Sequence, residues 1–385
     1  MFSFRFFLRI HDHVLFAVQM IPCYTIFGNV PKSVSIFFSL LGNVPDGDIM
    51  SQDVTILDVA RAARLSKSTV SRVLSGNSYG VSSDAVERVE EAVRRLGYVR
   101  NTLASSMRTN RSKTILLIIP DITNSFWAEV ARGVQDRFDS EGYSVVMANS
   151  DWEADRERRY IQLARMNRVD AVLINAPDID MSELSGVRCP VVLLGERKGR
   201  GGFPVVGTDT FGAVTEALEY LYRLGHRDIA LVHHDRPDSE GYGSSRLKAF
   251  RAFLNGKGLE DREDRIFTVP LVRESGAEIA RTLSTMDKRP SAMIAGNDLV
   301  AVGFLQEARR NGISVPRDIS VIGIDDIPSA TMISPALTTI GKPKLEIGRM
   351  AAEIVLKMLA GVQVDPVTLL PAQLIIRETT RQREA

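Results

Sequence analysis

The sequence predicts an α/β protein, in which a small all-α headpiece precedes a core of two lobes, each a doubly wound parallel sheet. The chain has 385 residues, too many for one hydrophobic core, so two or three domains are expected. Residues 55–97 repeat apolar side chains at helical spacing. From residue 113 onward, short apolar runs alternate with helical patterns in two successive rounds, which is typical of parallel sheets covered by helices.

The headpiece opens with a helix, a three-residue turn and a second helix over residues 55–76. Thr55 can cap the first helix in a capping box with Asp58, and Ser66 can cap the second. The polar face of the second helix carries no acid and consists of Lys67, Ser68, Thr69, Ser71 and Arg72. Hydroxyls of this kind reach phosphates and basic groups reach guanine edges, so the face favours DNA binding over an ordinary solvated hairpin.

A third helix is predicted over 82–97, where Ser82 can cap its start and Gly97 ends it. The run from Thr55-Ile-Leu-Asp-Val-Ala through Ser68-Thr-Val-Ser-Arg-Val-Leu-Ser-Gly76 to Leu96-Gly-Tyr-Val-Arg-Asn101 resembles the lactose/purine repressor family of bacterial transcription regulators. The resemblance extends from about Val54 to Glu378 and is most specific in the headpiece. Arg64 departs from the pattern, since the family has a turn glycine there. The turn must therefore accept a bulky residue, which can lie at positive φ.

The resemblance implies a homodimer, or a dimer of dimers, bound to a near-palindromic double-stranded DNA operator. Each second helix would enter a major groove, with Lys67, Ser68 and Arg72 at base edges and Thr69 and Ser71 at phosphates. Thr55 would also touch the DNA. The segment matching 101–107 would fold into a hinge helix on the operator, where Asn101 and Ala104 would lie against the duplex and Met107 would wedge into the minor groove.

The core is read as strand and helix in alternation. The predicted strands are 114–120, 143–148, 171–175, 191–194, a crossing strand near Gly207, 228–232, 266–269, 292–295 and 320–324. The predicted helices are 126–141, 156–167, 211–224, 246–255, 276–286 and 299–311. By the resemblance, this region has the periplasmic-binding-protein type I fold, in which the chain crosses between lobes near Gly207, near Lys342 and near 364–368.

The resulting domain assignment is 50–98 for the headpiece, 99–112 for the hinge and 113–385 for an effector-binding and dimerisation core. One lobe comprises 113–207 and 342–364, and the other comprises 208–341 and 365–380.

Polar and aromatic residues at the carboxyl ends of the strands form the candidate effector pocket. Asp121 and Asn124 can bond hydroxyls, while Phe126 and Trp127 can stack on a sugar ring or simply pack in the core. Arg246 matches the family's ligand-holding arginine, and its planar fork suits a carboxylate or vicinal hydroxyls. The remaining candidates are Asp209, Asn297, Asp298 and Asp325, of which Asp209 and Asp298 could also cap helices.

This set of groups favours a sugar or sugar derivative, with a purine as the alternative. Two departures from the family leave the ligand open. Gly195 replaces the usual strand-end aspartate, so that Glu196 or Arg197 could substitute for it, and Thr210 replaces a common asparagine.

Residues 1–49 do not fit this pattern, being rich in Phe and Ile with only three acids. The uncharged run 14–31 is about the minimum spanning length but contains Pro22 and Gly28, and no clean cleavage site follows. Because Met50 lies just before the family pattern begins, the preferred interpretation is a non-native or disordered extension. A signal or anchor on a periplasmic sugar-binding protein is the competing hypothesis.

Composition fits a cytoplasmic, nucleoid-associated regulator without a membrane partner. The net charge is +1, yet residues 51–110 hold nine basic residues against six acids, the local excess expected of a DNA reader. Cys23 and Cys189 lie far apart, and adjacent histidines such as His233 and His234 rarely face one site, so no metal or cofactor is expected. No nucleophile-elbow, P-loop or paired-carboxylate motif appears, so an enzyme is not expected.

Overall fold

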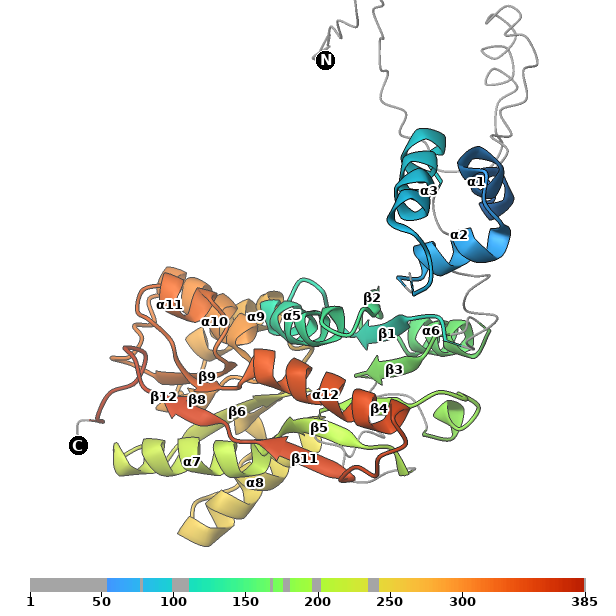
Figure 1. Cartoon of the computed structure of the whole chain (residues 1–385). Helices are drawn as coiled ribbons and strands as arrows, with labels where there is room; N and C mark the ends of the chain where they lie inside the picture. The colour runs from blue at the N-terminus through green and yellow to red at the C-terminus, as the bar shows by residue number, and fades with distance from the viewer. Residues whose placement is uncertain are drawn as a thin grey trace, which may run out of the picture. The chain divides into compact units, whose positions relative to one another are not determined.

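Figure 1 shows the fold as a computed structural model, which describes residues 54–76, 79–98, 111–166, 169–175, 181–195, 202–234 and 242–383. The chain divides into two compact units, residues 1–100 and residues 101–385. The predicted run 14–31, the hinge residues 99–110 and Met50 lie outside the described residues. Within the described ranges, no helix is both long and apolar enough to cross a membrane.

The headpiece consists of α1 (Ile56–Ala63), α2 (Lys67–Leu74) and α3 (Ser83–Leu96) around fully buried Val59, Val70 and Val89. Its predicted caps are confirmed. The Asp58 carboxylate accepts from the Thr55 backbone N–H at 2.9 Å and from its hydroxyl at 2.6 Å, and these bonds hold the pKa of Asp58 below its usual range.

The Ser66 hydroxyl accepts from the Thr69 N–H at 3.1 Å, and the Ser82 hydroxyl accepts from the Ala85 N–H at 3.3 Å. Arg64 sits at φ 53° as its turn position requires, so the expectation of a bulky residue at positive φ is also confirmed.

The first lobe is built on a six-stranded sheet in the order β11-β5-β4-β3-β1-β2. Every neighbouring pair in it is parallel. The strands are β1 (Thr114–Ile119), β2 (Ser144–Asn149), β3 (Ala171–Ile174), β4 (Val191–Leu194), β5 (Val205–Thr208) and β11 (Val367–Leu370). The helices are α5 (Ser125–Asp139), α6 (Ala154–Met166) and α12 (Lys344–Leu359), with a 3-10 turn at Met181–Leu184. One core cluster joins α5 and α12 to the sheet, and a second joins α6 to its other side.

The second lobe repeats this plan, with a sheet in the order β12-β10-β9-β8-β6-β7. The strands are β6 (Ile229–His233), β7 (Ile266–Thr268), β8 (Ala292–Ile294), β9 (Ser320–Asp325), β10 (Thr338–Gly341) and β12 (Gln373–Ile375). Only the β10–β12 pair is antiparallel. The helices are α7 (Thr210–Arg223), α8 (Tyr242–Lys257), α9 (Arg273–Ser284), α10 (Asp298–Arg310) and α11 (Ser329–Met332), with a 3-10 turn at Glu263–Arg265. Core clusters lie on both faces of this sheet, as the predicted doubly wound architecture requires.

Paired helices in the first lobe approach closely because glycine lies at their contact. A Cβ on Gly133 of α5 would stand 2.1 Å from the Leu345 carbonyl oxygen of α12, and one on Gly348 would stand 2.1 Å from the Val130 carbonyl oxygen. In Figure 1, α12 runs from the second lobe back across the first. Its first turn therefore begins at the boundary between the lobes.

The third crossing differs from the sequence prediction. β11 pairs in parallel with β5 of the first sheet, so the chain returns to the second lobe only between Leu370 and Gln373. The prediction had placed this crossing near 364–368 and assigned 365–380 to the second lobe. The sequence of a short strand does not indicate which strand it pairs with, because pairing depends on the tertiary structure.

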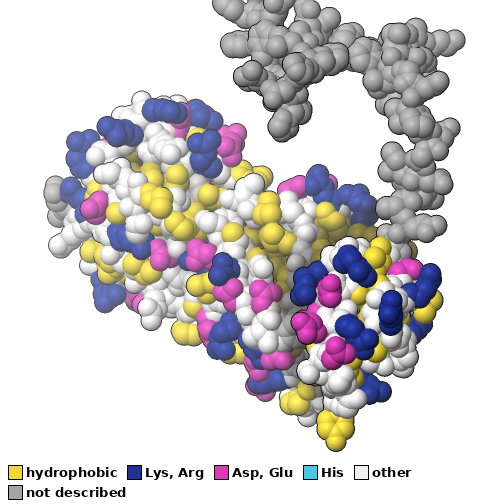
Figure 2. Space-filling model, turned by 45° about the horizontal axis from the view of Figure 1, so that its top comes forward, with side chains coloured by type: hydrophobic (Ala, Val, Ile, Leu, Met, Phe, Trp, Pro, Cys, Tyr) yellow, Lys and Arg dark blue, Asp and Glu magenta, His cyan; other side chains and the backbone are white. Residues whose placement is uncertain are grey.

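On the face drawn in Figure 2, basic and acidic side chains are interspersed, in keeping with the net charge of +1.

Candidate functional site

The polar face of α2 is presented to solvent in the headpiece. Lys67, Ser68 and Arg72 are exposed, while Thr69 and Ser71 are half-buried. Neither Lys67 nor Arg72 takes part in an ion pair among the described residues, whereas Arg61 of α1 pairs with Asp58 at 3.2 Å. Such cations remain available to an external anion without first breaking a salt bridge.

Hydroxyls at the start of α2 form a small network. The Ser66 hydroxyl lies 2.7 Å from the Ser68 hydroxyl and 2.8 Å from that of Thr69. The cap therefore orients two of the side chains that the sequence assigned to DNA. Thr55, at the start of α1, is exposed. The hinge candidates Asn101, Ala104 and Met107 lie outside the described residues.

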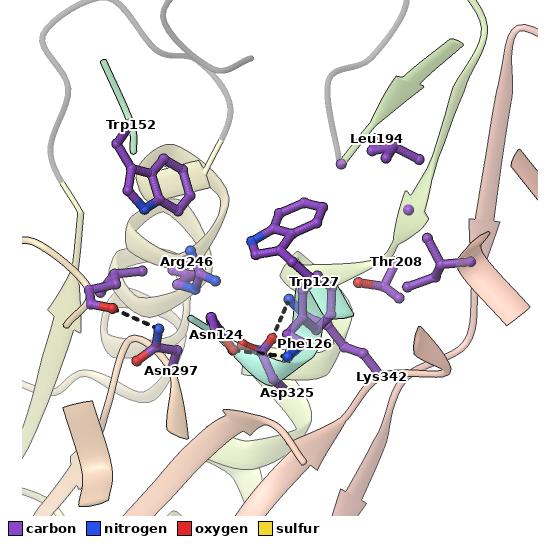
Figure 3. A pocket seen from close by; sticks show the side chains of 14 residues that line it. Asn124, Phe126, Trp127, Trp152, Leu194, Thr208, Arg246, Asn297, Asp325 and Lys342 are labelled. Atoms are coloured by element: carbon purple, nitrogen blue, oxygen red, sulfur yellow. Dashed lines mark hydrogen bonds and ion pairs between the residues drawn. The ribbon is translucent and has the colours of Figure 1, made fainter. Parts of the chain in front are cut away.

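A pocket opens between the two lobes of the core, with a volume of about 620 Å³ including its open mouth. Figure 3 shows its labelled side chains arranged around one space. The first lobe contributes Asn124, Phe126, Trp127, Trp152, Leu194, Gly195, Gly207, Thr208 and Ile347 to its wall. The second lobe contributes Arg246, Leu271, Asn297 and Asp325, and Lys342 belongs to a crossing segment.

Six of the nine predicted effector residues line this pocket: Asn124, Phe126, Trp127, Arg246, Asn297 and Asp325. The two amides are held by helix capping. Asn124 accepts from the Phe126 N–H at 3.0 Å, and Asn297 accepts from the Val300 N–H at 2.9 Å. Asn297 also donates to the Leu271 carbonyl at 2.9 Å.

The aromatic side chains at the start of α5 contact both the first-lobe core and the pocket. Trp127 is 5 % exposed and belongs to the first-lobe core cluster, yet it also lines the pocket. Phe126 meets it edge to face, with ring centroids 4.9 Å apart. Core packing and ligand contact, which the sequence left as alternatives, are therefore compatible for Trp127.

Charge at the pocket is organised around Asp325, at the carboxyl end of β9. Its carboxylate pairs with Lys342 at 3.2 Å, and both side chains are almost fully buried. The Lys342 ammonium also lies 5.4 Å from the centre of the Phe126 ring. Asp325 has φ 114°, an unusual conformation for a residue with a side chain, and the Lys344 ammonium holds it by donating to the Asp325 carbonyl at 3.0 Å.

Three predicted effector residues lie outside the pocket wall. Asp121 accepts from the N–H and the hydroxyl of Thr123, which closes a local turn. Asp209 is exposed and caps α7, accepting from the Gly212 N–H at 3.0 Å. The sequence analysis listed both acids as effector candidates and named helix capping as an alternative for Asp209. That cap is present, and contact of either acid with an effector stays a prediction.

Asp298 is the third, and it is completely buried. It accepts from the Ile327 N–H at 2.8 Å and from the Thr339 hydroxyl at 2.5 Å, and so ties α10 to two neighbouring segments. Burial, with the nearby Asp325 charge adding to it, raises the pKa of Asp298 to about 8. Its role in the described fold is therefore internal.

Sequence reasoning missed Trp152 and Lys342 as pocket residues. Trp152 follows β2, so the strand-end rule that found Asp121 could have found it. Lys342 was recognised only as a crossing position, and its burial against Asp325 has no sequence signal. Glu196 and Arg197, expected as substitutes for a missing aspartate, lie outside the described residues. Within the described ranges, no group of three or more His, Cys, Asp or Glu side chains is placed to hold a metal ion.

Comparisons with known proteins agree with both parts of the chain. The profile of bacterial regulatory proteins of the lacI family matches residues 55–101, and that of the periplasmic binding protein-like domain matches residues 218–380. Catabolite control protein A of Priestia megaterium is 32% identical over 333 residues, which cover 86% of this chain and 100% of that protein.

Solved structures give the same picture. The lac repressor dimer bound to operator and the anti-inducer ONPF matches with a TM-score of 0.75 and 25% identity, covering 85% of this chain and 99% of that one. The complex of the transcriptional regulator CelR with cellobiose matches with a TM-score of 0.63 and 27% identity, again covering 85% and 99%. These proteins are transcription regulators by name.

Proposed function

Because this chain belongs to the lacI family of bacterial regulatory proteins, we propose that it is a transcriptional repressor controlled by a small effector. It binds a near-palindromic operator as a homodimer, or as a dimer of dimers, in the cytoplasm on the nucleoid. A sugar or sugar derivative in the pocket between the lobes sets its affinity for DNA. The observation that carries the proposal is the combination in one chain of an exposed basic α2 face and a two-lobed pocket.

The DNA-binding role rests on α2. Arg72 and Lys67 are exposed cations on a face without acids, and short hydroxyls surround them. A guanidinium that contacts a guanine edge contributes roughly 1–3 kcal/mol of discrimination, so Arg72→Ala should weaken operator binding about 5- to 150-fold. Arg88→Ala is the matched control, because it removes the same charge from α3, where Arg88 pairs with Asp84 at 3.2 Å.

Duplex binding is measured with the intergenic DNA upstream of the gene, at several salt concentrations. A specific operator complex lost in Arg72→Ala and kept in Arg88→Ala supports the proposal. Equal losses in the two variants would mean that α2 contributes only general electrostatic attraction. No specific duplex at moderate salt would favour a sugar receptor without DNA-binding function.

The effector role rests on the pocket. The pocket wall contains aromatic rings that can stack, two amides that cap helices, Arg246 and Asp325. These groups together suit a ligand with many hydroxyls and an apolar ring face. The similarity to a regulator solved with cellobiose supports the same class. Arg246→Ala should leave the operator bound but unresponsive to sugars. Arg251→Ala is its control, since Arg251 lies on the same helix but pairs with Asp261 and Glu263 at the surface.

Coupling between the two functions requires that a ligand change the spacing of the lobes. Lys344 already links them, since its ammonium binds the Asp326 carbonyl of the second lobe at 2.6 Å and lies 3.7 Å from Glu129 of α5. A ligand that contacts both walls shifts the balance between lobe arrangements by its differential affinity for them. That shift biases the hinge segment 101–107, and by linkage the operator alters ligand affinity to the same degree.

A further inference from the structure

Trp152 occupies a strained loop at the mouth of the pocket. Asp151 and Trp152 both adopt positive φ, at 51° and 61°, which is costly for residues with side chains. Neighbouring groups fix the loop. Arg156 forms ion pairs with Asp151 and with Glu153, and the Asn149 amide donates to Asp151 at 2.5 Å. A conformation that is held this firmly places the indole in a defined position.

The Trp152 ring stacks on a side chain of the opposite lobe. Its partner is His234, which directly follows β6, with ring centroids 6.1 Å apart and planes inclined by 25°. The neighbouring His233 ring is tied to the Thr268 hydroxyl of β7 at 3.1 Å, so the end of β6 is itself anchored. Both Trp152 and His234 are half-buried. The stack therefore joins the Trp152 loop of the first lobe to the end of β6 in the second lobe.

Topology places this contact on the side of the pocket away from the chain crossings. The crossings leave from β5 and β11, at one end of the first sheet, and from β10 and β12, at one end of the second. Trp152 follows β2, at the opposite end of the first sheet, and His234 follows β6, next to the opposite end of the second. The lobes are thus joined covalently on one side and by an aromatic contact on the other.

We propose that Trp152 positions the effector and, through its stack on His234, acts as a latch that holds the lobes closed over the pocket. The inference rests on the proposed effector site and adds to it a residue and a closing mechanism. Trp152 lines the pocket together with Trp127 and Arg246, and Figure 3 shows these three side chains around the same space. A cyclic ligand with an apolar face, such as a pyranose, binds against the indole from inside while His234 supports the ring from the opposite lobe.

The chain has two tryptophans, and both line this pocket, so tryptophan fluorescence reports directly on it. In the full-length Trp127→Phe protein, Trp152 is the sole source of tryptophan emission. Acrylamide quenching of that emission, without any sugar, measures how well the latch shields the indole. An aromatic pair changes the ratio of closed to open lobes by roughly 2- to 10-fold. His234→Ala should therefore raise the quenching constant of Trp152. His234→Phe keeps an aromatic ring at this position, so its quenching constant should stay near that of the protein with His234.

The second arm tests the effector, with Trp127 intact. Cellobiose, D-glucose and D-ribose are titrated against the operator complex of the wild type, His234→Ala, Trp152→Ala and the double variant. His234→Ala should weaken the response to an active sugar by about the same 2- to 10-fold factor, with faster sugar dissociation. Trp152→Ala should weaken it further, and the double variant should match Trp152→Ala, because the latch is already lost.

Two results would overturn the latch. The first is equal quenching in the His234→Ala and His234→Phe proteins, and the second is additive effects of the two alanine substitutions on sugar affinity. If none of the three sugars changes the affinity of the wild-type protein for its operator, the proposed effector class fails, while the quenching comparison still decides whether the latch exists.

Discussion

Gly133→Ala should destabilise the core, because it forces a methyl group against backbone. The new Cβ would lie 2.1 Å from the Leu345 carbonyl oxygen and 2.9 Å from its carbonyl carbon. Carbon atoms pack at about 3.5 Å or more, so α12 must move away from α5 by roughly 1 Å. Overpacking of this kind costs up to about 3 kcal/mol, and the better helix propensity of alanine returns up to about 1 kcal/mol. We therefore expect a net loss of about 2 kcal/mol.

Thermal unfolding followed by circular dichroism measures this loss, which corresponds to a fall of about 5 °C in the Tm of a core of this size. Gly256→Ala is the matched control. Gly256 lies on the exposed side of α8, and a Cβ there meets nothing within 4 Å, so this variant should gain stability by up to about 1 kcal/mol. Gly348→Ala should repeat the loss from the other helix.

Combining Gly133→Ala with Gly348→Ala should cost less than the sum of the two losses, since a single displacement relieves both contacts. Sugar affinity should fall as well, because α12 carries Ile347 and α5 begins beside Phe126, both in the pocket wall. A Gly133→Ala protein that unfolds at or above the wild-type temperature would refute the close-packing argument.

Three further predictions concern groups outside this helix pair. Ser66→Ala removes the cap that accepts from Thr69, so the headpiece should lose about 1 kcal/mol in urea unfolding, and an unchanged midpoint would show that the cap is not needed. The raised pKa of Asp298, about 8, means that the folded state keeps a proton which the unfolded state releases near pH 4. Stability relative to Asp298→Asn should therefore fall as pH rises from about 4 to 8 and then level off, and parallel pH profiles of the two proteins would argue against the shift. Burial raises the pKa of the Cys189 thiol to about 11, so iodoacetamide should label the Cys189 peptide far more slowly in native than in denatured protein, and equal rates by mass spectrometry would contradict it.

Local interactions account for what the sequence determined. Helix caps and helix ends involve residues within one turn of each other, so they can be predicted from neighbouring positions in the sequence. This holds for the caps at Thr55, Ser66 and Ser82 and for the helix end at Gly97. The alternation of apolar runs likewise gave the strands and helices from Thr114 to Asp325, because burial on both faces of a parallel sheet leaves a continuous apolar signature. Family motifs then supplied the headpiece and the two-lobed class of the core.

Tertiary structure decided the rest, since it depends on groups far apart in sequence. The sequence pattern is the same for acids at strand ends that have different roles in the structure. Asp209 caps a helix, Asp298 is buried, and Asp325 faces the pocket. The pairing of β11 with the first sheet and the meeting of Trp152 with His234 carry no local signal at all. Only the relative placement of the two sheets brings those side chains within contact distance, and the pocket is a product of that placement.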